Sequence, residues 1–174
     1  MVFTLLAFRL LWGVVGGRWS RFASFIYSPG SVINYLKGRA HPDHLIGHNP
    51  MGAASVFAML LVLLAQVGTG LVSDDEISFT GPLNRFVSSA NGLAATWYHK
   101  AVGQWLLLAL AVLHIGAVLF YLWKKNDNLI RPMITGDKAA AAASSRDDAG
   151  SRLMAAVIFG VCAGFVYWLV TLKT

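Results

Sequence analysis

Long apolar runs alternate along the chain with shorter hydrophilic segments. Four runs stand out, at residues 1–17, 51–72, 94–123 and 153–172. A helix needs about 20 apolar residues to cross the hydrocarbon core of a bilayer, and the last three runs are that long. The pattern predicts an all-α integral membrane protein, a helical bundle of about four transmembrane helices in contact with membrane lipid.

The first run differs from the others in its length. It is short, and Arg9 interrupts its apolar residues. It does not resemble a secretory signal peptide, because no basic segment precedes it and no small-residue cleavage site follows it. We expect a genuine span whose beginning is missing, so that the chain starts part-way into a longer protein.

The hydrophilic connections alternate in charge. The connection at residues 18–49 carries four basic residues against one acidic residue, the connection at 73–93 carries three acidic residues against one basic residue, and the connection at 124–152 is basic again. Basic connections stay on the cytoplasmic side of a membrane. The first and third connections are therefore expected in the cytoplasm and the acidic one outside it.

The overall composition agrees with a membrane class and argues against nucleic-acid binding. Hydrophobic residues make up 56% of the chain and charged residues only 13%, whereas soluble domains carry about 25% charged residues. The net charge is +6, but the basic residues lie beside the ends of apolar runs, where membrane topology places them. The one cysteine, Cys162, lies in an apolar run and can form no disulfide within the chain.

Two local signals concern the second apolar run. Asn49-Pro50 just before it has the form of a helix cap followed by proline at the first helical position. Gly68 and Gly70 near its other end either let a flat cofactor approach the backbone or pack against a neighbouring helix.

His99 and His114 lie in the third run. Ionisable residues inside a membrane are costly and therefore suggest a function. On a helix, their separation of 15 residues corresponds to about 22 Å of rise and roughly 60° of rotation, so both rings can face one side of the bundle near opposite membrane surfaces. Neutral imidazole is an axial ligand of haem iron, which makes two haem sites one interpretation. The other is a pair of polar histidines bonded to neighbouring helices.

The remaining candidates are weaker. His41, His44 and His48 lie close together in a hydrophilic connection, but they specify no metal geometry, and a solvated loop explains them. His48 is the strongest of the three as a cofactor-binding residue, because it abuts the start of a helix. Arg9 either extends toward the cytoplasmic surface or neutralises a haem propionate near that surface.

Several short stretches resemble, in order, the bacterial cytochrome b561 and nickel–iron hydrogenase b-type cytochrome family. Each stretch alone is a weak signal, but the ordered set is specific and extends from residue 1 to about residue 138. The chain then divides into a partial cytochrome b561-like membrane domain (1–138), a low-complexity linker (139–150) and a C-terminal transmembrane helix (151–174). The matching stretches are Phe8–Gly13 with Arg21-Phe22, Gly47–Gly52, Gln66–Leu71 with Asp74-Asp75 and Gly81–Leu83, Trp97–His99, Leu113-His114, and Asn128–Gly136.

The resemblance implies a set of haem ligands. In that family the fourth helix supplies one axial histidine to each of two b-type haems, and His99 and His114 match those two positions as ligands of the haem iron. The family's first and second helices supply the other two ligands. This chain has no counterpart of the first helix, and no histidine precedes His41. We therefore expect two haem b in the full-length parent and incomplete sites within these residues.

The resemblance also implies a role. It predicts a multi-pass electron-transfer subunit of the bacterial inner membrane, rather than a catalyst on its own, that passes electrons between a periplasmic c-type cytochrome or hydrogenase and quinone. The alternative is a haem-free membrane anchor or assembly subunit. A small transporter subunit is disfavoured, because the spans lack polar residues at the midplane and paired Pro/Gly breaks.

Overall fold

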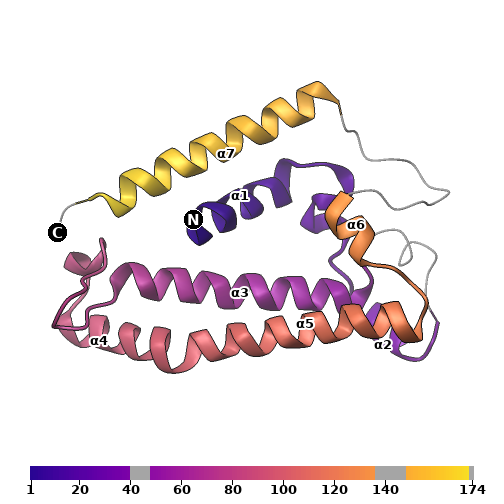
Figure 1. Cartoon of the computed structure of the whole chain (residues 1–174), viewed down its shortest axis with the longest axis horizontal. Coiled ribbons are helices and arrows are strands. Elements are labelled where there is room, and N and C mark those ends of the chain that lie inside the picture. Colours follow the sequence, from indigo (N-terminus) through magenta and orange to yellow (C-terminus); the bar gives the residue numbers. More distant parts are fainter. Residues whose placement is uncertain (40–47, 136–147, 173–174) are drawn as a thin grey trace.

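The structure is a computed structural model that describes residues 1–39, 48–135 and 148–172. Figure 1 shows the elements in chain order, and all the regular ones are helical. The α-helices are α1 (Val2–Val15), α2 (Pro29–Leu36), α3 (Pro50–Val72), α4 (Ser89–Trp97), α5 (Gln104–Lys124), α6 (Ile130–Thr135) and α7 (Ala149–Val170). A π-helical turn, η5 (Tyr98–Gly103), joins α4 to α5, and the 3₁₀ turns are η1 (Arg18–Ser20), η2 (Phe22–Ser24) and η4 (Asn84–Phe86).

The predicted all-α membrane architecture is confirmed. In the described part of the chain, three helices are long and apolar enough to cross a bilayer: α3 with 23 residues, the continuous helix Ser89–Lys124 with 36 residues, and α7 with 22 residues. The shorter apolar helix α1 has 14 residues, which corresponds to about 21 Å of rise. The expected spans at 51–72, 94–123 and 153–172 all coincide with long helices, although the last two begin earlier than expected.

Capping side chains explain where the long helices begin. The Asn49 Oδ1 accepts a hydrogen bond from the Gly52 N–H at 2.8 Å, which confirms the predicted cap of α3. The Ser88 hydroxyl caps α4, and the Asp148 Oδ1 caps α7 by accepting from the Ser151 N–H at 2.8 Å. Ser28 starts α2, a helix that the sequence analysis did not predict within the first connection.

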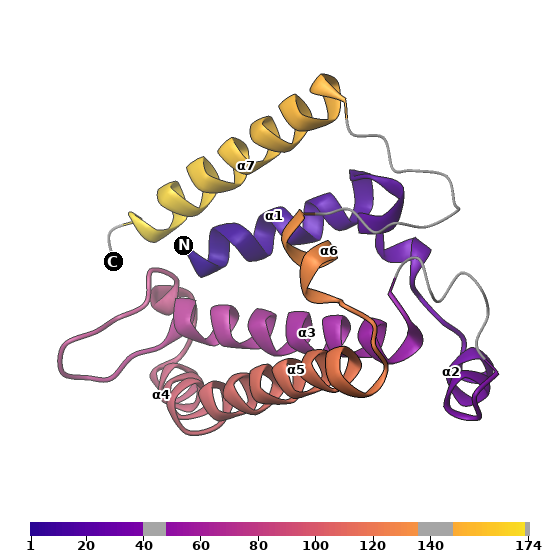
Figure 2. The same cartoon turned by 45° about the vertical axis from the view of Figure 1, so that its right-hand side comes forward.

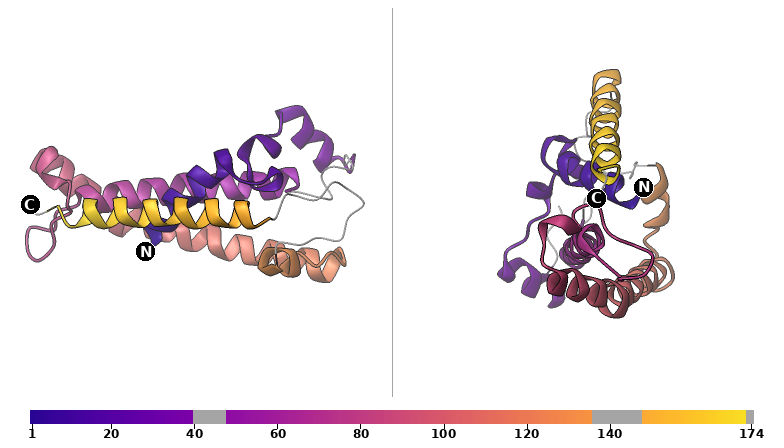
Figure 3. Two further views of the ribbon diagram at one scale, coloured as in Figure 1. Left: turned by 90° about the horizontal axis from the view of Figure 1, so that it is seen from above. Right: turned by 90° about the vertical axis from the view of Figure 1, so that its left-hand side faces the viewer.

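The long helices pack as an open row rather than around one shared core. In the described residues α7 packs on α1, α1 contacts α3, and α3 packs on α5 and on η5. Figure 2 and the right-hand view of Figure 3 show α7 and α5 at opposite edges of this row. No residue of α5 is buried, and Leu113 on it is 68% exposed. Because each helix has few neighbours, large apolar surfaces remain free for lipid or for other membrane helices.

The connections lie at the two ends of this row. The acidic connection between α3 and α4 lies at one end in Figure 1, and the segments that follow α1 and α5 lie at the other. This arrangement places the acidic connection opposite the basic ones, as the charge pattern predicts. His41 and His44 lie outside the described residues.

Candidate functional site

His99 lies in the π-helical turn η5, between α4 and α5. π-helical turns are rare in proteins, and those that occur often lie at functional sites. Such a turn accommodates one extra residue and so shifts the phase of the helix by about 100°. The rotation between His99 and His114 therefore changes from the roughly 60° of a regular helix to about 40° in the opposite sense. Both rings still face α3.

The His99 imidazole is held by α3. Its Nδ1 lies 2.9 Å from the Gln66 carbonyl oxygen and 3.3 Å from the Thr69 hydroxyl. A carbonyl only accepts hydrogen bonds, so this contact requires the proton on Nδ1. The Nε2 atom then carries a free lone pair, and it makes no hydrogen bond within the described residues. A neutral imidazole in this tautomer is ready to bind a metal through Nε2.

Gly70 allows the ring of His99 to lie close to α3. A Cβ at this glycine would come within 3.0 Å of the ring's Cε1 atom. Gly68, one residue before Thr69, has nothing within 4 Å of its Cβ position, so only one of the two predicted glycines has a close neighbour. The group that packs closely on Gly70 is thus the imidazole of His99 from the neighbouring helix. This contact is helix packing, and it also positions a candidate cofactor ligand.

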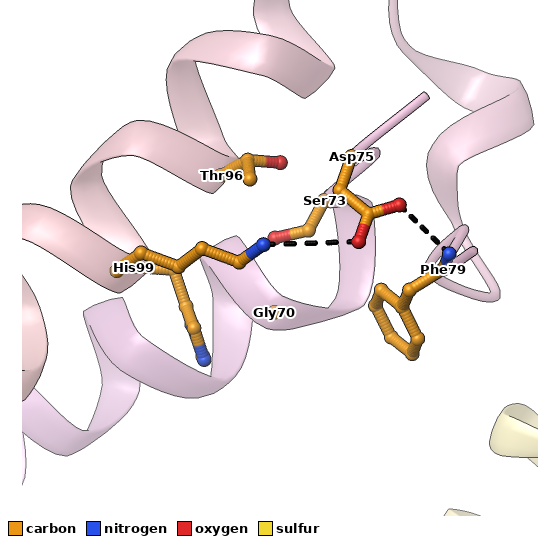
Figure 4. A pocket seen from close by; sticks show the side chains of 7 residues that line it. Gly70, Ser73, Asp75, Phe79, Thr96 and His99 are labelled. Atoms are coloured by element: carbon orange, nitrogen blue, oxygen red, sulfur yellow. Dashed lines mark hydrogen bonds and ion pairs between the residues drawn. The ribbon is translucent and has the colours of Figure 1, made fainter. Parts of the chain in front are cut away.

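A cavity of about 370 Å³ opens beside His99. It lies where α3 and α4 meet the acidic connection, and Figure 4 shows His99 over the α3 turn that contains Gly70. Two of its lining side chains form an ion pair, with the Lys100 ammonium 3.7 Å from the Asp75 carboxylate. The lining residues are Gly70, Ser73, Asp75, Phe79, Thr96, His99 and Lys100.

The carboxylate of Asp75 organises the acidic connection. Its Oδ1 accepts hydrogen bonds from the backbone N–H groups of Ser78 at 2.9 Å, Phe79 at 2.8 Å and Ile77 at 3.2 Å. These donors stabilise the ionised form, and with a smaller contribution from Lys100 they hold the pKa of Asp75 well below its usual 3.8. The wall of the cavity is therefore an ordered turn with a permanent negative charge.

Gln66 makes a second contact with His99. The Gln66 Nε2 donates a hydrogen bond to the His99 backbone carbonyl at 3.0 Å. The other end of the amide, Oε1, is buried and has no hydrogen-bond partner within the described residues. An orphaned buried acceptor costs about 1–3 kcal/mol. The sequence analysis cited Gln66 only within a family stretch, because an isolated glutamine in an apolar run carries no recognisable motif.

His114 lies on the same face, farther along α5. Its Nδ1 lies 3.4 Å from the hydroxyl of Ser55 on α3, and the ring is half-buried. Its Nε2 makes no hydrogen bond within the described part of the chain. The two candidate ligands are therefore presented alike, each with Nδ1 toward α3, although the contact at His114 is longer.

The structure brings the two weaker candidates together at the end of the row opposite the acidic connection. The Arg9 guanidinium donates to the Ser20 carbonyl at 2.9 Å and lies 5.0 Å from the centre of the Phe22 ring. The His48 ring packs 4.5 Å from the centre of the Phe25 ring. Burial lowers the pKa of His48, and the charge of Arg9 lowers it further. Both side chains already have protein partners, which makes them weaker ligand candidates than His99 and His114.

A hydrogen-bond cluster near His48 was not predicted. The hydroxyls of Tyr35 and Tyr121 lie 2.6 Å apart, and Asn49 donates to Tyr121 at 3.3 Å. Burial and the neighbouring hydroxyl raise the pKa of Tyr35. This cluster ties α2 and the start of α3 to the end of α5.

Most of the chain, including both candidate ligands, matches a known protein family. A family model for prokaryotic cytochrome b561 matches residues 1–136. The chain belongs to the prokaryotic cytochrome b561 family. Both candidate ligands and the α3 residues that contact them lie within the matched segment.

Two curated relatives agree with this assignment. The probable Ni/Fe-hydrogenase 1 B-type cytochrome subunits of Escherichia coli strain K12 and of Escherichia coli O157:H7 are each 27% identical to this chain over 154 residues. The match covers 78% of this chain and 65% of each relative. The chain thus spans just under two thirds of the length of these relatives. No solved structure matches it.

Membership in a cytochrome b family implies haem b, and the site at His99 fits that group. The bond of Nδ1 to a carbonyl leaves Nε2 available, Gly70 lets the ring lie against α3, and a cavity lies next to the ring. No cluster of three or more potential metal ligands lies within the described residues. A haem, whose porphyrin already holds the iron, needs only axial ligands from the protein, so single histidines on a helix suit it.

Proposed function

We propose that this protein is a multi-pass b-type cytochrome subunit that transfers electrons across the bacterial inner membrane, between a periplasmic redox partner and the quinone pool. The observation that carries the proposal is the pair His99 and His114. They lie on one helix long enough to span a membrane, about 21 Å apart along its axis once the extra residue of the π-helical turn is allowed for. Each has Nδ1 directed at α3 and Nε2 left free.

Each histidine would supply one axial ligand to one of two b-type haems. Bound haem iron supplies reversible one-electron chemistry. The chain's own residues position the ligands: α3 orients both rings through Gln66, Thr69 and Ser55. Arg9 is the candidate partner of a haem propionate near the cytoplasmic side, with His48 as a weaker candidate for the same haem. The second axial ligands would come from outside the described residues.

The partner is proposed from the relatives. Their names describe a cytochrome subunit of a nickel–iron hydrogenase, which favours a hydrogenase as the periplasmic electron donor. A periplasmic c-type cytochrome is the alternative partner. The acidic connection beside His99 would face that partner, and the basic end beside His114 would face the cytoplasm.

Haem counting tests the proposal. The protein is expressed in membranes from its own genomic locus and purified, and haem b per chain is measured by pyridine haemochrome and by reduced-minus-oxidised spectra. We expect two haems in the wild type and one in each of His99→Ala and His114→Ala. His44→Ala, which alters a histidine of the hydrophilic connection, is the control and should keep two.

The outcomes separate the rival functions. Two haems in both single variants, with unchanged spectra, would show that these histidines are not the ligands. A wild type without a cytochrome b spectrum would favour a haem-free membrane anchor. A separate assay distinguishes the two donors. The purified protein receives electrons from either a hydrogenase or a c-type cytochrome, and its reduction of quinone is then measured with each donor.

A further inference from the structure

Gln66 contacts His99 through both its backbone and its side chain. Its carbonyl lies 2.9 Å from the His99 Nδ1, and its Nε2 donates to the His99 carbonyl at 3.0 Å. We propose that Gln66 is the positioning residue for His99, holding the imidazole in the Nδ1-protonated tautomer with Nε2 directed at the haem iron. The inference rests on the proposed function, because it assigns a role toward the same haem.

Both hydrogen bonds join the same two residues, Gln66 on α3 and His99 in η5. One fixes the ring, and the other fixes the backbone that carries the ring. The His99 carbonyl only accepts hydrogen bonds, so it determines which end of the Gln66 amide faces it. An apolar side chain of the same size would pack against η5 but would leave the His99 backbone without this anchor.

The position of the other amide end supports a dedicated role. Gln66 Oε1 lies against Gly103, the last residue of the π-helical turn, where a Cβ would clash with it. The same oxygen is buried without a partner within the described residues. The turn therefore has a glycine where the amide needs space, and the amide leaves one polar atom unsatisfied in order to reach the His99 carbonyl.

The chemistry of the ligand gives the expected effect. A hydrogen bond from Nδ1–H to a carbonyl fixes the ring orientation and makes the imidazole a stronger electron donor. A stronger donor favours the ferric state and lowers the midpoint potential of its haem. Loosening the Gln66 contact should therefore raise the potential of the haem held by His99 and leave the haem held by His114 unchanged.

Two variants alter the contact from opposite sides. Gln66→Leu removes the amide but keeps a similar volume, and Gly103→Ala displaces the amide by adding a methyl group on η5. Gln104→Leu is the matched control, because Gln104 is exposed at the start of α5, directly after the turn. His114 serves as the internal control in every sample.

The first measurement is ¹⁵N NMR of the histidine side chains in the dithionite-reduced protein, which reports the tautomer with or without haem. We expect His99 to carry its proton on Nδ1 in the wild type. Exchange of that proton with solvent should be several-fold faster in Gln66→Leu and in Gly103→Ala and unchanged in Gln104→Leu. A proton on Nε2 in the wild type, or unchanged exchange in both variants, would overturn the proposal.

The second measurement is a redox titration of the haem-loaded protein. An upward shift of one haem potential in both variants, with the other haem unmoved and both haems retained, is the expected result. Equal shifts of both haems, or no shift, would show that Gln66 has only a structural role. A wild type that binds no haem would refute the proposed function, whereas the NMR result would still decide whether Gln66 sets the tautomer of His99.

Discussion

Arg9 and His48 show how a charge and a titratable group interact across the chain. They lie 39 residues apart in the sequence, yet the charge of Arg9 lowers the pKa of His48. Burial of the imidazole, which packs against the Phe25 ring, is the larger cause of the same shift. His48 is therefore expected to stay neutral at pH 7 beside the cationic Arg9. The positive charge of Arg9 would attract the carboxylate of a haem propionate.

Replacing the cation should raise the pKa of His48. In Arg9→Gln the repulsion between the two positive charges disappears, so the pKa should move up toward the ordinary 6.5 but stay below it, because the burial remains. An NMR titration of the imidazole measures this shift. Arg18→Gln, an exposed arginine in the same region, is the control and should leave the midpoint unchanged.

The sign of the linked stability follows from the same shift. The folded state holds His48 neutral, whereas the unfolded chain takes up a proton below about pH 6.5. The stabilisation is therefore complete above that pH and is lost as the pH falls from 6.5 through the lowered pKa of the folded state. A pKa for His48 above 6.5 in the wild type would contradict the described packing.

Among the helices, α3 is the element on which the others depend. It packs against α1, α2, α4, α5 and η5. It begins at the Asn49 cap, and its C-terminal half contributes Gln66, Thr69 and Gly70 to the site. Loss of order at its start should therefore affect both ends of the bundle.

Substituting the cap tests this dependence. Asn49→Ala removes the hydrogen bond to the Gly52 N–H and the bond to Tyr121, and the first loss alone costs about 1 kcal/mol. A cost of that size should lower the thermal midpoint in detergent by about 2–4 °C. Asn49→Ser retains a capping oxygen but not the contact with Tyr121, so its midpoint should lie between those of Asn49→Ala and the wild type. Equal midpoints for all three proteins would mean that the cap contributes nothing to stability.

The π-helical turn is a second feature at this level. Its position next to His99 could not be read from hydrophobic periodicity, because the long stretch that follows it, residues 105–123, is apolar on nearly every side. A strongly apolar helix shows no preferred face, so a shift of one residue in its phase leaves no trace in the pattern. The identity of the groups that contact His99 depends on that phase.

For the molecule as a whole, the row of helices and the distribution of charge define an orientation. The acidic connection carries the cavity beside His99 at one end, and the basic segments gather at the other. With few internal contacts, the helices rely on the surrounding membrane to cover their apolar faces. From the positive-inside rule we propose that His99 lies toward the outer surface and His114 toward the cytoplasm.

Cysteine labelling in intact cells tests this orientation. The native Cys162 is only 3% exposed and is first replaced by alanine to give a cysteine-free background. In that background, Glu76→Cys should react with a membrane-impermeant maleimide from the periplasm, whereas Lys125→Cys should react only after the inner membrane is opened. Both positions are exposed in the structure, so access should depend on the side of the membrane. The reverse pattern would invert the proposed path of the electrons.

Much of the architecture follows from the sequence alone. The length of an apolar run is a property of the segment itself, so three of the spans, their alternating orientation and the all-α class could be predicted. The cap at Asn49 involves only neighbouring residues and was predicted for the same reason. The two histidines were recognisable because an ionisable group is conspicuous in an apolar run.

The tertiary structure decided what surrounds those residues. Whether Gln66 meets His99, whether Ser55 meets His114 and whether Arg9 meets His48 depends on how separate helices align. Each pair is separated by tens of residues in the sequence, and a one-residue change of phase at η5 would bring different side chains together. The candidate ligands could therefore be named from the sequence, but the tautomer, orientation and support of each imidazole arise only when α3 and α5 pack side by side.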